Sequence, residues 1–325
     1  MTTPVLAGDD PAAIARAAQV LRDGRLVAFP TETVYGLGGD ALDAAVITKI
    51  FAAKQRPADN PLIVHVAEVA GARALVREFP EVAEKAATLW PGPLTIVLRR
   101  NDRVPDATTA GQDTVALRVP DHPVALALLR ACGLPLAAPS ANRSGRPSPT
   151  LASHVLADLD GRVDLILDGG PTRHGLESTV LDLTGPRPLL LRRGAVTLEQ
   201  LRALLGEVDS VDEADEAAKA RSPGLRHRHY APRARVELVS EGTGEAAAAR
   251  AIAGGEQVAL VCRREVRSAA LVERLPAGLP EFARALFASL RALDATGVDR
   301  IVVEAVPEDG IGAAIMDRLR RAAAG

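Results

Sequence analysis

The hydrophobic positions at the start of the chain fall into helical and strand patterns. Residues 11–23 carry an apolar stripe at helical spacing, between an N-cap candidate, Asp10, and a helix stop, Gly24. Short apolar runs follow at Leu26 to Phe29 and at Leu62 to Val66, which is the length of buried strands. The pattern predicts a helix first and then two strands.

The rest of the amino-terminal half continues this alternation, and one pair of strands is joined by a hairpin at 184–187. Strands that alternate with helices and are also joined by hairpins predict an α/β fold with a twisted mixed sheet and flanking helices. Further strands are expected at 94–98, 115–119, 134–138, 163–167, 179–183 and 188–192, and helices from near Asp43 and at 68–77, 80–89, 123–131, 151–158 and 197–205.

A charged segment separates this part from a second α/β pattern. Residues 206–234 are acidic in their first half and basic in their second, which is typical of a solvated linker. We therefore predict a catalytic domain at 1–205, a linker at 206–234 and a smaller Rossmann-like α/β domain at 235–325. In the last domain, strands are expected at 235–239, 257–262 and 300–304, and helices at 244–253, 281–294 and 311–323.

Composition limits the classes of function. The chain has 325 residues, of which 2% are aromatic. Its formal net charge of −2 argues against a general nucleic-acid coat protein. Cys132 and Cys262 fall in different predicted domains, so a reduced, cytoplasmic chain is expected. We find no secretory leader and no apolar run of membrane-spanning length.

The densest polar stretch begins where the strand at 26–29 ends. Pro30 to Tyr35 is a polar turn, and Gly36, Gly38 and Gly39 follow, where positive φ angles would let the backbone approach a ligand. Gly36-x-Gly38-x-x-Ala41 matches a dinucleotide fingerprint only weakly, because the turn separates it from the strand. No P-loop, H-E-x-x-H, G-x-S-x-G or zinc motif is present.

Several cations occupy the ends of predicted elements. Lys54 and Arg56 end a helix, where they either relieve its dipole or clamp a triphosphate. Asn60 precedes a proline and either caps its own turn or binds phosphate. Arg192, at a strand end, either faces a nucleotide or is solvated.

Two polar residues interrupt apolar strands. His65 shares a strand face with Ile63, where a hydrogen-bonded core histidine is the ordinary interpretation and a ligand contact the alternative. Arg118 must find an anion, because an unpaired buried guanidinium is costly. That anion is either an internal carboxylate or the carboxylate of a substrate.

Several motifs together resemble one family. PTETVYGLG, KQR, NPLIVHV, WPGPLTIVL, LRVP, PSANRSGRPSPT, ESTVLDL and LLRRG are similar to motifs of the YrdC-type L-threonylcarbamoyladenylate synthases. SPGLRHRHYAP resembles the linker of the long, two-domain form. Leu225 is a departure, because this form often has methionine there.

The resemblance implies a nucleotidyltransferase that condenses L-threonine, bicarbonate or CO2, and ATP into threonylcarbamoyl-AMP and pyrophosphate, with Mg2+ accompanying ATP. The product would pass to the machinery that modifies adenosine 37 of tRNAs reading ANN codons; direct tRNA contact, metal ligands and a catalytic residue stay open. By motif, the threonine pocket would include Thr33, His65, Arg118, Ala138 and Ser178, and the ATP site Lys54, Arg56, Asn60, Thr114, Ser140, Ser148, Arg192 and Tyr230.

Two further expectations concern the linker and the competing function. Residues 222–232 combine basic side chains with Tyr230, a rare aromatic here, and are predicted to form a lid over the active site. The alternative function is an RNA-binding module that uses the same basic cavity. The near-neutral charge and the scarcity of stacking aromatics disfavour this alternative.

Overall fold

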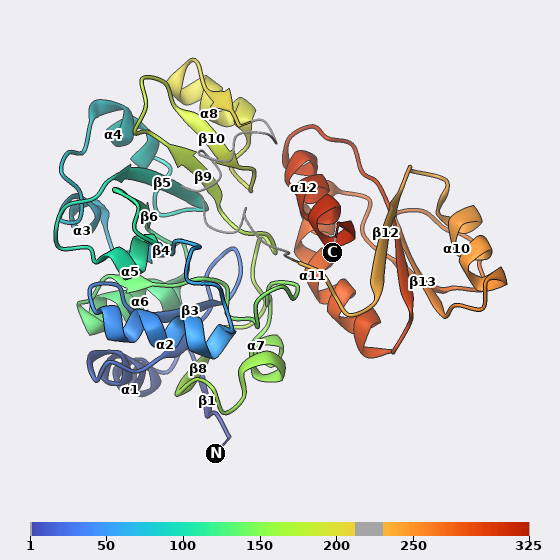
Figure 1. The fold of residues 1–325 in the computed structure, drawn as a ribbon, viewed down its shortest axis with the longest axis horizontal. Coiled ribbons are helices and arrows are strands. Elements are labelled where there is room, and N and C mark those ends of the chain that lie inside the picture. Colours follow the sequence, from blue (N-terminus) through green and yellow to red (C-terminus); the bar gives the residue numbers. More distant parts are fainter. Residues whose placement is uncertain (1, 212–229, 325) are drawn as a thin grey trace. The chain divides into compact units, whose positions relative to one another are not determined.

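The chain folds as two compact units, shown in Figure 1. The computed structural model describes residues 2–211 and 230–324. The first unit contains the described residues up to 144, 149–173 and 177–211. The second contains 230–324 together with two short loops from the amino-terminal part, 145–148 and 174–176. The domain bounds predicted from the sequence did not foresee that these loops belong to the second unit.

The first unit is built on a mixed sheet, as predicted. Its strand order is β1-β8-β2-β3-β7-β4-β6-β5-β9-β10-β11, with parallel and antiparallel neighbours. The predicted hairpin is confirmed, because β9 and β10 pair antiparallel. The strands are β1 (Val5–Ala7), β2 (Val27–Phe29), β3 (Gly36–Asp40), β4 (Ile63–His65), β5 (Leu94–Arg99), β6 (Thr114–Arg118), β7 (Leu136–Ala137), β8 (Leu165–Asp168), β9 (Thr179–Asp182), β10 (Leu189–Arg192) and β11 (Asp209–Ser210).

Two helices of the first unit begin at the caps that the sequence indicates. The side chain of Asp10 accepts a hydrogen bond from Ala12 N, and that of Asp43 from Ala45 N and Val46 N. Helices α1 and α6 pack against each other (Figure 1). The helices are α1 (Pro11–Arg22), α2 (Ala44–Lys54), α3 (Val69–Arg73), α4 (Glu81–Ala87), α5 (Asp106–Thr109), α6 (Pro123–Cys132), α7 (Ala152–Leu159) and α8 (Leu198–Leu205).

The central strands separate a large core from a smaller apolar cluster. Val64 and Leu117 belong to the large core, whereas their neighbours Ile63 and Ala116 belong to the smaller cluster. Successive side chains of a strand point to opposite faces, so the two clusters lie on opposite faces of the sheet. We call the smaller one the floor cluster, which consists of Ile63, Val97, Ala116, Val180 and Leu191.

The glycines of β3 serve packing, which corrects the expectation of positive φ angles. None of Gly36, Gly38 and Gly39 has a positive φ. A Cβ on Gly38 would lie 2.7 Å from Phe29 Cε1, and one on Gly39 would lie 2.6 Å from Val46 Cγ1. These glycines therefore let neighbouring side chains reach the strand.

The second unit is a smaller α/β layer with a parallel sheet, as predicted. Its strand order is β12-β15-β13-β14, and its core lies between this sheet and α11 and α12. The sequence pattern missed β14. The elements are β12 (Arg235–Val239), α10 (Gly244–Ala253), β13 (Val258–Cys262), β14 (Leu271–Arg274), α11 (Leu279–Ala295), β15 (Arg300–Glu304) and α12 (Ile311–Ala323).

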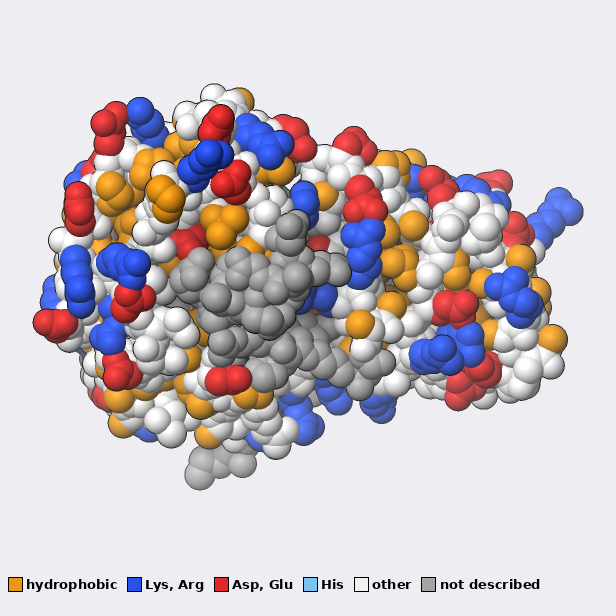
Figure 2. All heavy atoms as spheres, turned by 45° about the horizontal axis from the view of Figure 1, so that its top comes forward, with side chains coloured by type: hydrophobic (Ala, Val, Ile, Leu, Met, Phe, Trp, Pro, Cys, Tyr) orange, Lys and Arg blue, Asp and Glu red, His pale blue; other side chains and the backbone are white. Residues whose placement is uncertain are grey.

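Acidic and basic side chains are interspersed over the face drawn in Figure 2. This pattern agrees with the formal net charge of −2. None of the described helices combines the length and the apolar character needed to cross a bilayer.

Packing at β3 generates a stability prediction. Gly39→Ala should lower the free energy of unfolding by about 1–3 kcal/mol, because the new methyl group would overlap Val46, a stiff β-branched residue of α2. The control is Gly185→Ala, where the nearest atom, Arg187 O, lies 3.8 Å from the added Cβ. Urea unfolding would measure both, and equal midpoints for Gly39→Ala and the wild type would contradict this explanation of the glycine.

Candidate functional site

The register of two parallel strands brings His65 and Arg118 together. In β4 and β6, His65 is the partner of Arg118, and both residues end their strands. Both side chains are buried. Each follows a member of the floor cluster by two residues, so each points to the floor side of the sheet. The carboxyl ends of β4 and β6 therefore place a cation next to the floor cluster.

Arg118 is held on three sides, and one of its partners is an internal carboxylate. Its Nε donates to Gly92 O at 3.3 Å, and its Nη2 donates to Thr33 Oγ1 at 2.9 Å. The same Nη2 lies 2.7 Å from Glu32 Oε1. The sequence left an internal and a substrate carboxylate open, and the structure shows the internal one. Sequence reasoning missed Glu32, although it is the neighbour of Thr33 in the same polar turn.

His65 is an uncharged imidazole at neutral pH. Burial, and then the charge of Arg118, lower its pKa from 6.5 to about 3. Its ring meets Phe29 edge-on, with 6.4 Å between the ring centroids. Its Nδ1 has no hydrogen-bond partner among the described residues. His65 therefore occupies a buried core position, and its Nδ1 remains available for a ligand contact.

Two hydroxyls and a second arginine lie at the same end of the sheet. Ser178 Oγ lies 2.8 Å from Thr95 Oγ1, and Arg192 donates from Nε to Ser178 O at 3.0 Å and from Nη2 to Ser178 Oγ at 3.1 Å. Sequence reasoning missed Thr95, because nothing in the strand pattern shows that this hydroxyl lies next to Ser178. Arg192, predicted from the resemblance for ATP, lies with Ser178, predicted for threonine.

Lys54 fastens the loop that follows β7. Its Nζ donates to Asn142 O at 2.6 Å and to Ser140 O, and Ser144 N donates back to Lys54 O at 2.9 Å. The side chain is 1% exposed. The ammonium therefore does more than relieve the dipole of α2, because it orders the loop that carries Ser140.

Arg56 and Asn60 form a short turn next to this loop. Arg56 Nη2 donates to Pro61 O at 3.2 Å and lies 3.4 Å from Asn60 O. Asn60 is buried and precedes β4, whereas His65 ends that strand. Ser140 belongs to the same end, because β7 runs antiparallel to β4 and Ala138 N donates to Ile63 O at 3.0 Å.

The predicted residues of the first unit thus form two clusters. Thr114 begins β6 and Arg118 ends it, which separates them by roughly 13 Å at about 3.3 Å per residue. Ala138 lies between the two ends. We call the two groups the carboxyl-end cluster (Thr33, His65, Arg118, Ser178 and Arg192) and the amino-end cluster (Lys54, Arg56, Asn60, Thr114 and Ser140).

Ser148 and Tyr230 belong to the second unit. The Tyr230 ring is 4% exposed and stacks on Phe287 at 5.3 Å between centroids, with the Arg318 guanidinium 5.5 Å from it. Ala231 N donates to Gly145 O at 2.8 Å, which ties the end of the linker to the loop that carries Ser148. That these two residues contact ATP stays a prediction, and residues 222–229 of the predicted lid lie outside the described residues.

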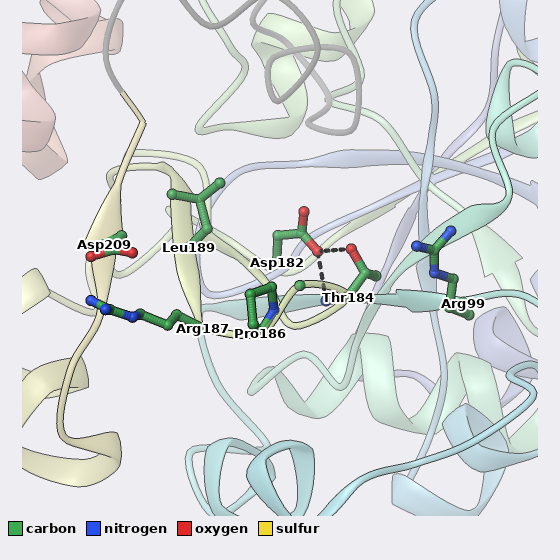
Figure 3. Close-up of a pocket in the computed structure, with 8 residues that line it drawn as sticks. Arg99, Asp182, Thr184, Pro186, Arg187, Leu189 and Asp209 are labelled. Atoms are coloured by element: carbon green, nitrogen blue, oxygen red, sulfur yellow. Dashed lines mark hydrogen bonds between the residues drawn. The ribbon is translucent and has the colours of Figure 1, made fainter.

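A hollow of about 440 Å³ lies at the other end of β5 and β9 from Thr95 and Ser178 (Figure 3). Its Arg99 is the strand partner of Thr114. Its Asp182 accepts hydrogen bonds from Thr184 N at 2.9 Å and Thr184 Oγ1 at 2.6 Å. Two arginines and two aspartates balance its charge, so it lacks the cationic character of a phosphate site. It is lined by Arg99, Asp182, Thr184, Gly185, Pro186, Arg187, Leu189 and Asp209.

No group of three or more His, Cys, Asp or Glu side chains that would hold a metal ion occurs within residues 2–211 and 230–324. The two clusters themselves offer cations, hydroxyls, an amide and the neutral imidazole of His65. Such groups suit anionic and zwitterionic ligands.

Comparisons with known proteins agree with the resemblance seen in the motifs. Residues 19–194 match the family model Sua5_yciO_yrdC, described as telomere recombination, and residues 196–324 match Sua5_C, described as threonylcarbamoyl-AMP synthase, C-terminal domain. The chain is 47% identical to the threonylcarbamoyl-AMP synthase of Pyrococcus abyssi, over 94% of this chain and 92% of the relative. It is 46% identical to that of Bacillus subtilis, over 99% and 96%.

Solved structures agree over the whole chain. The crystal structure of Pyrococcus abyssi Sua5 complexed with L-threonine matches with a TM-score of 0.93 and 44% identity, over 99% of this chain and 97% of that one. The structure of a doubly substituted form of the same Pyrococcus abyssi protein matches with a TM-score of 0.94 and 43% identity, over 99% of this chain and 96% of that one. The chain therefore belongs to the Sua5/YciO/YrdC family, in the two-domain form that carries the Sua5 carboxyl-terminal domain.

Proposed function

We propose that this chain is an L-threonylcarbamoyl-AMP synthase, a nucleotidyltransferase that condenses L-threonine, bicarbonate or CO2, and ATP. The observation that carries the proposal is the identity of 46–47%, over nearly the whole chain, to relatives that bear this name. The two polar clusters support it, because a zwitterionic amino acid and a triphosphate need different partners at a fixed separation.

Threonine is assigned to the carboxyl-end cluster. Arg118 Nη1 has no partner among the described residues and offers a donor to the α-carboxylate. Neutral His65, with Nδ1 unused, suits an uncharged contact to the side-chain hydroxyl or the reacting amine. The Thr33 and Ser178 hydroxyls and the backbone at Ala138 complete the pocket.

ATP is assigned to the amino-end cluster. Arg192 lies with Ser178 in the carboxyl-end cluster, but we keep it, like Ser148 and Tyr230, as a predicted contact of ATP. Lys54 and Arg56 supply charge for the phosphates, while Asn60, Thr114 and Ser140 supply amide and hydroxyl groups. Mg2+ enters with ATP as part of that substrate and offsets the phosphate charge.

The reaction needs no nucleophile from the protein. The neutral threonine amine adds to the carbon of CO2 and releases a proton, or adds to the carbon of bicarbonate and releases water. Either route forms an N-carboxylate. An oxygen of this N-carboxylate attacks the α-phosphorus of ATP, and the bond to the β-phosphate oxygen breaks to release pyrophosphate. Positioning of the reactants and stabilisation of phosphate charge account for the catalysis. The separation of the two clusters along β6 fits this role.

The product serves tRNA modification, so we place the activity in the cytoplasm, upstream of a threonylcarbamoyl transfer to adenosine 37 of ANN-decoding tRNAs. A mixed anhydride of a carbamate with AMP is prone to hydrolysis. A transferase must therefore consume it soon after release.

The proposed reaction predicts a double requirement. Release of pyrophosphate from ATP should need both L-threonine and bicarbonate, because the attacking group forms only from the two together. A coupled pyrophosphate assay with each substrate omitted in turn measures this. Formation of ADP and phosphate with no AMP-containing species would contradict the proposal.

The assignment of ATP predicts the effect of one substitution. Arg56→Ala should lower kcat/KM for ATP about 10- to 100-fold, because a charge-assisted hydrogen bond is worth about 1.5–3 kcal/mol. Arg130→Ala, at an exposed position of α6, is the control for loss of an arginine. Unchanged ATP kinetics with a lowered melting temperature would assign Arg56 to the turn that it bridges, and not to the nucleotide.

A further inference from the structure

Glu32 is a fully buried carboxylate with one partner. Its exposed fraction is 0%, and Arg118 Nη2 lies 2.7 Å from its Oε1. Neither carboxylate oxygen accepts a directed hydrogen bond from any described residue. A carboxylate has room for about four donors, so the environment of Glu32 is poor in donors for a buried anion.

The bonds around Arg118 leave only one direction for a ligand. A guanidinium is planar, so fixing two of its nitrogens fixes the third. Gly92 O holds Nε, whereas Thr33 Oγ1 and Glu32 hold Nη2. Within the described chain, Nη1 is the nitrogen that remains to donate. Glu32 therefore helps decide where Nη1 points.

Stability alone does not explain this ion pair. Burying two opposite charges costs desolvation that their attraction only roughly repays, and apolar residues of similar volume are often as stable. Glu32 also borders the carboxyl-end cluster, whose members Arg118 and Thr33 belong to the predicted threonine pocket. Its location points to a role in holding a ligand group.

We propose that Glu32, which the family motifs did not assign, is a positioning residue for the amino-acid substrate. It orients Arg118 so that Nη1 meets the substrate carboxylate. Its negative charge also balances Arg118, so that the pocket accepts a zwitterion of zero net charge in preference to a simple anion. The inference rests on the proposed function, since it assumes that threonine binds at Arg118.

The test is the binding of each substrate to the full-length protein. Glu32→Gln keeps the shape of the side chain and removes its charge, and should weaken L-threonine binding about 10-fold or more, with ATP binding within about two-fold of the wild type. Glu81→Gln, an exposed glutamate that pairs with Lys85, should change neither. Isothermal calorimetry gives both dissociation constants, and the melting temperature of each variant is recorded alongside.

A double-mutant cycle separates positioning from general damage. If Glu32 acts through Arg118, then Glu32→Gln combined with Arg118→Lys should bind threonine no more weakly than Arg118→Lys alone. Full additivity of the two losses, or unchanged threonine binding by Glu32→Gln, would overturn the inference.

If Glu32→Gln does not fold, Glu32→Asp replaces it, because this variant keeps the charge but has a shorter side chain. It should also weaken L-threonine binding and leave ATP binding nearly unchanged. Wild-type threonine affinity in a folded Glu32→Asp protein then overturns the inference. A wild-type protein that binds no threonine at all would instead refute the proposed function.

Discussion

A buried guanidinium in the middle of a sheet sets the strongest constraint on this structure. Arg118 is 3% exposed, and three separate segments meet around it: the polar turn after β2, the turn before β5, and β6 itself. Because an unpaired buried cation is costly, these segments are held in one arrangement. The polar turn that carries Glu32 and Thr33 is thus fixed by an ion pair as well as by its own hydrogen bonds.

The same constraint organises the chemistry along the sheet. One cluster ends β4 and β6 and offers an arginine donor beside a neutral His65, while the other precedes them and offers Lys54 and Arg56. The apolar floor cluster between the two provides a surface of lower polarity, where charges interact more strongly than in water. An amino acid and a triphosphate placed at the two ends would face each other across this floor. The reaction then depends on placement, without a protein nucleophile.

Local signals predicted much of the fold, and long-range contacts account for what they missed. Asp10 and Asp43 marked helix starts, and alternation placed Ile63 and His65 on one face, because caps and periodicity are properties of neighbours. The role of the β3 glycines depends on Phe29 and Val46, and the Glu32 pair joins segments far apart in the sequence. Neither contact can be inferred from the spacing of residues along the sequence. The resemblance named every member of the two clusters, but it could not show that Lys54 also orders the loop that carries Ser140.

The central claim is that the two clusters join threonine to AMP through a carbon atom from bicarbonate. Mass spectrometry of the protein incubated with L-threonine, ATP and 13C-labelled bicarbonate tests it most directly. The account predicts an AMP adduct that contains threonine and one additional labelled carbon, absent when any one substrate is left out. An adduct of threonine and AMP without the labelled carbon would contradict the account, because it would show direct activation of the threonine carboxylate.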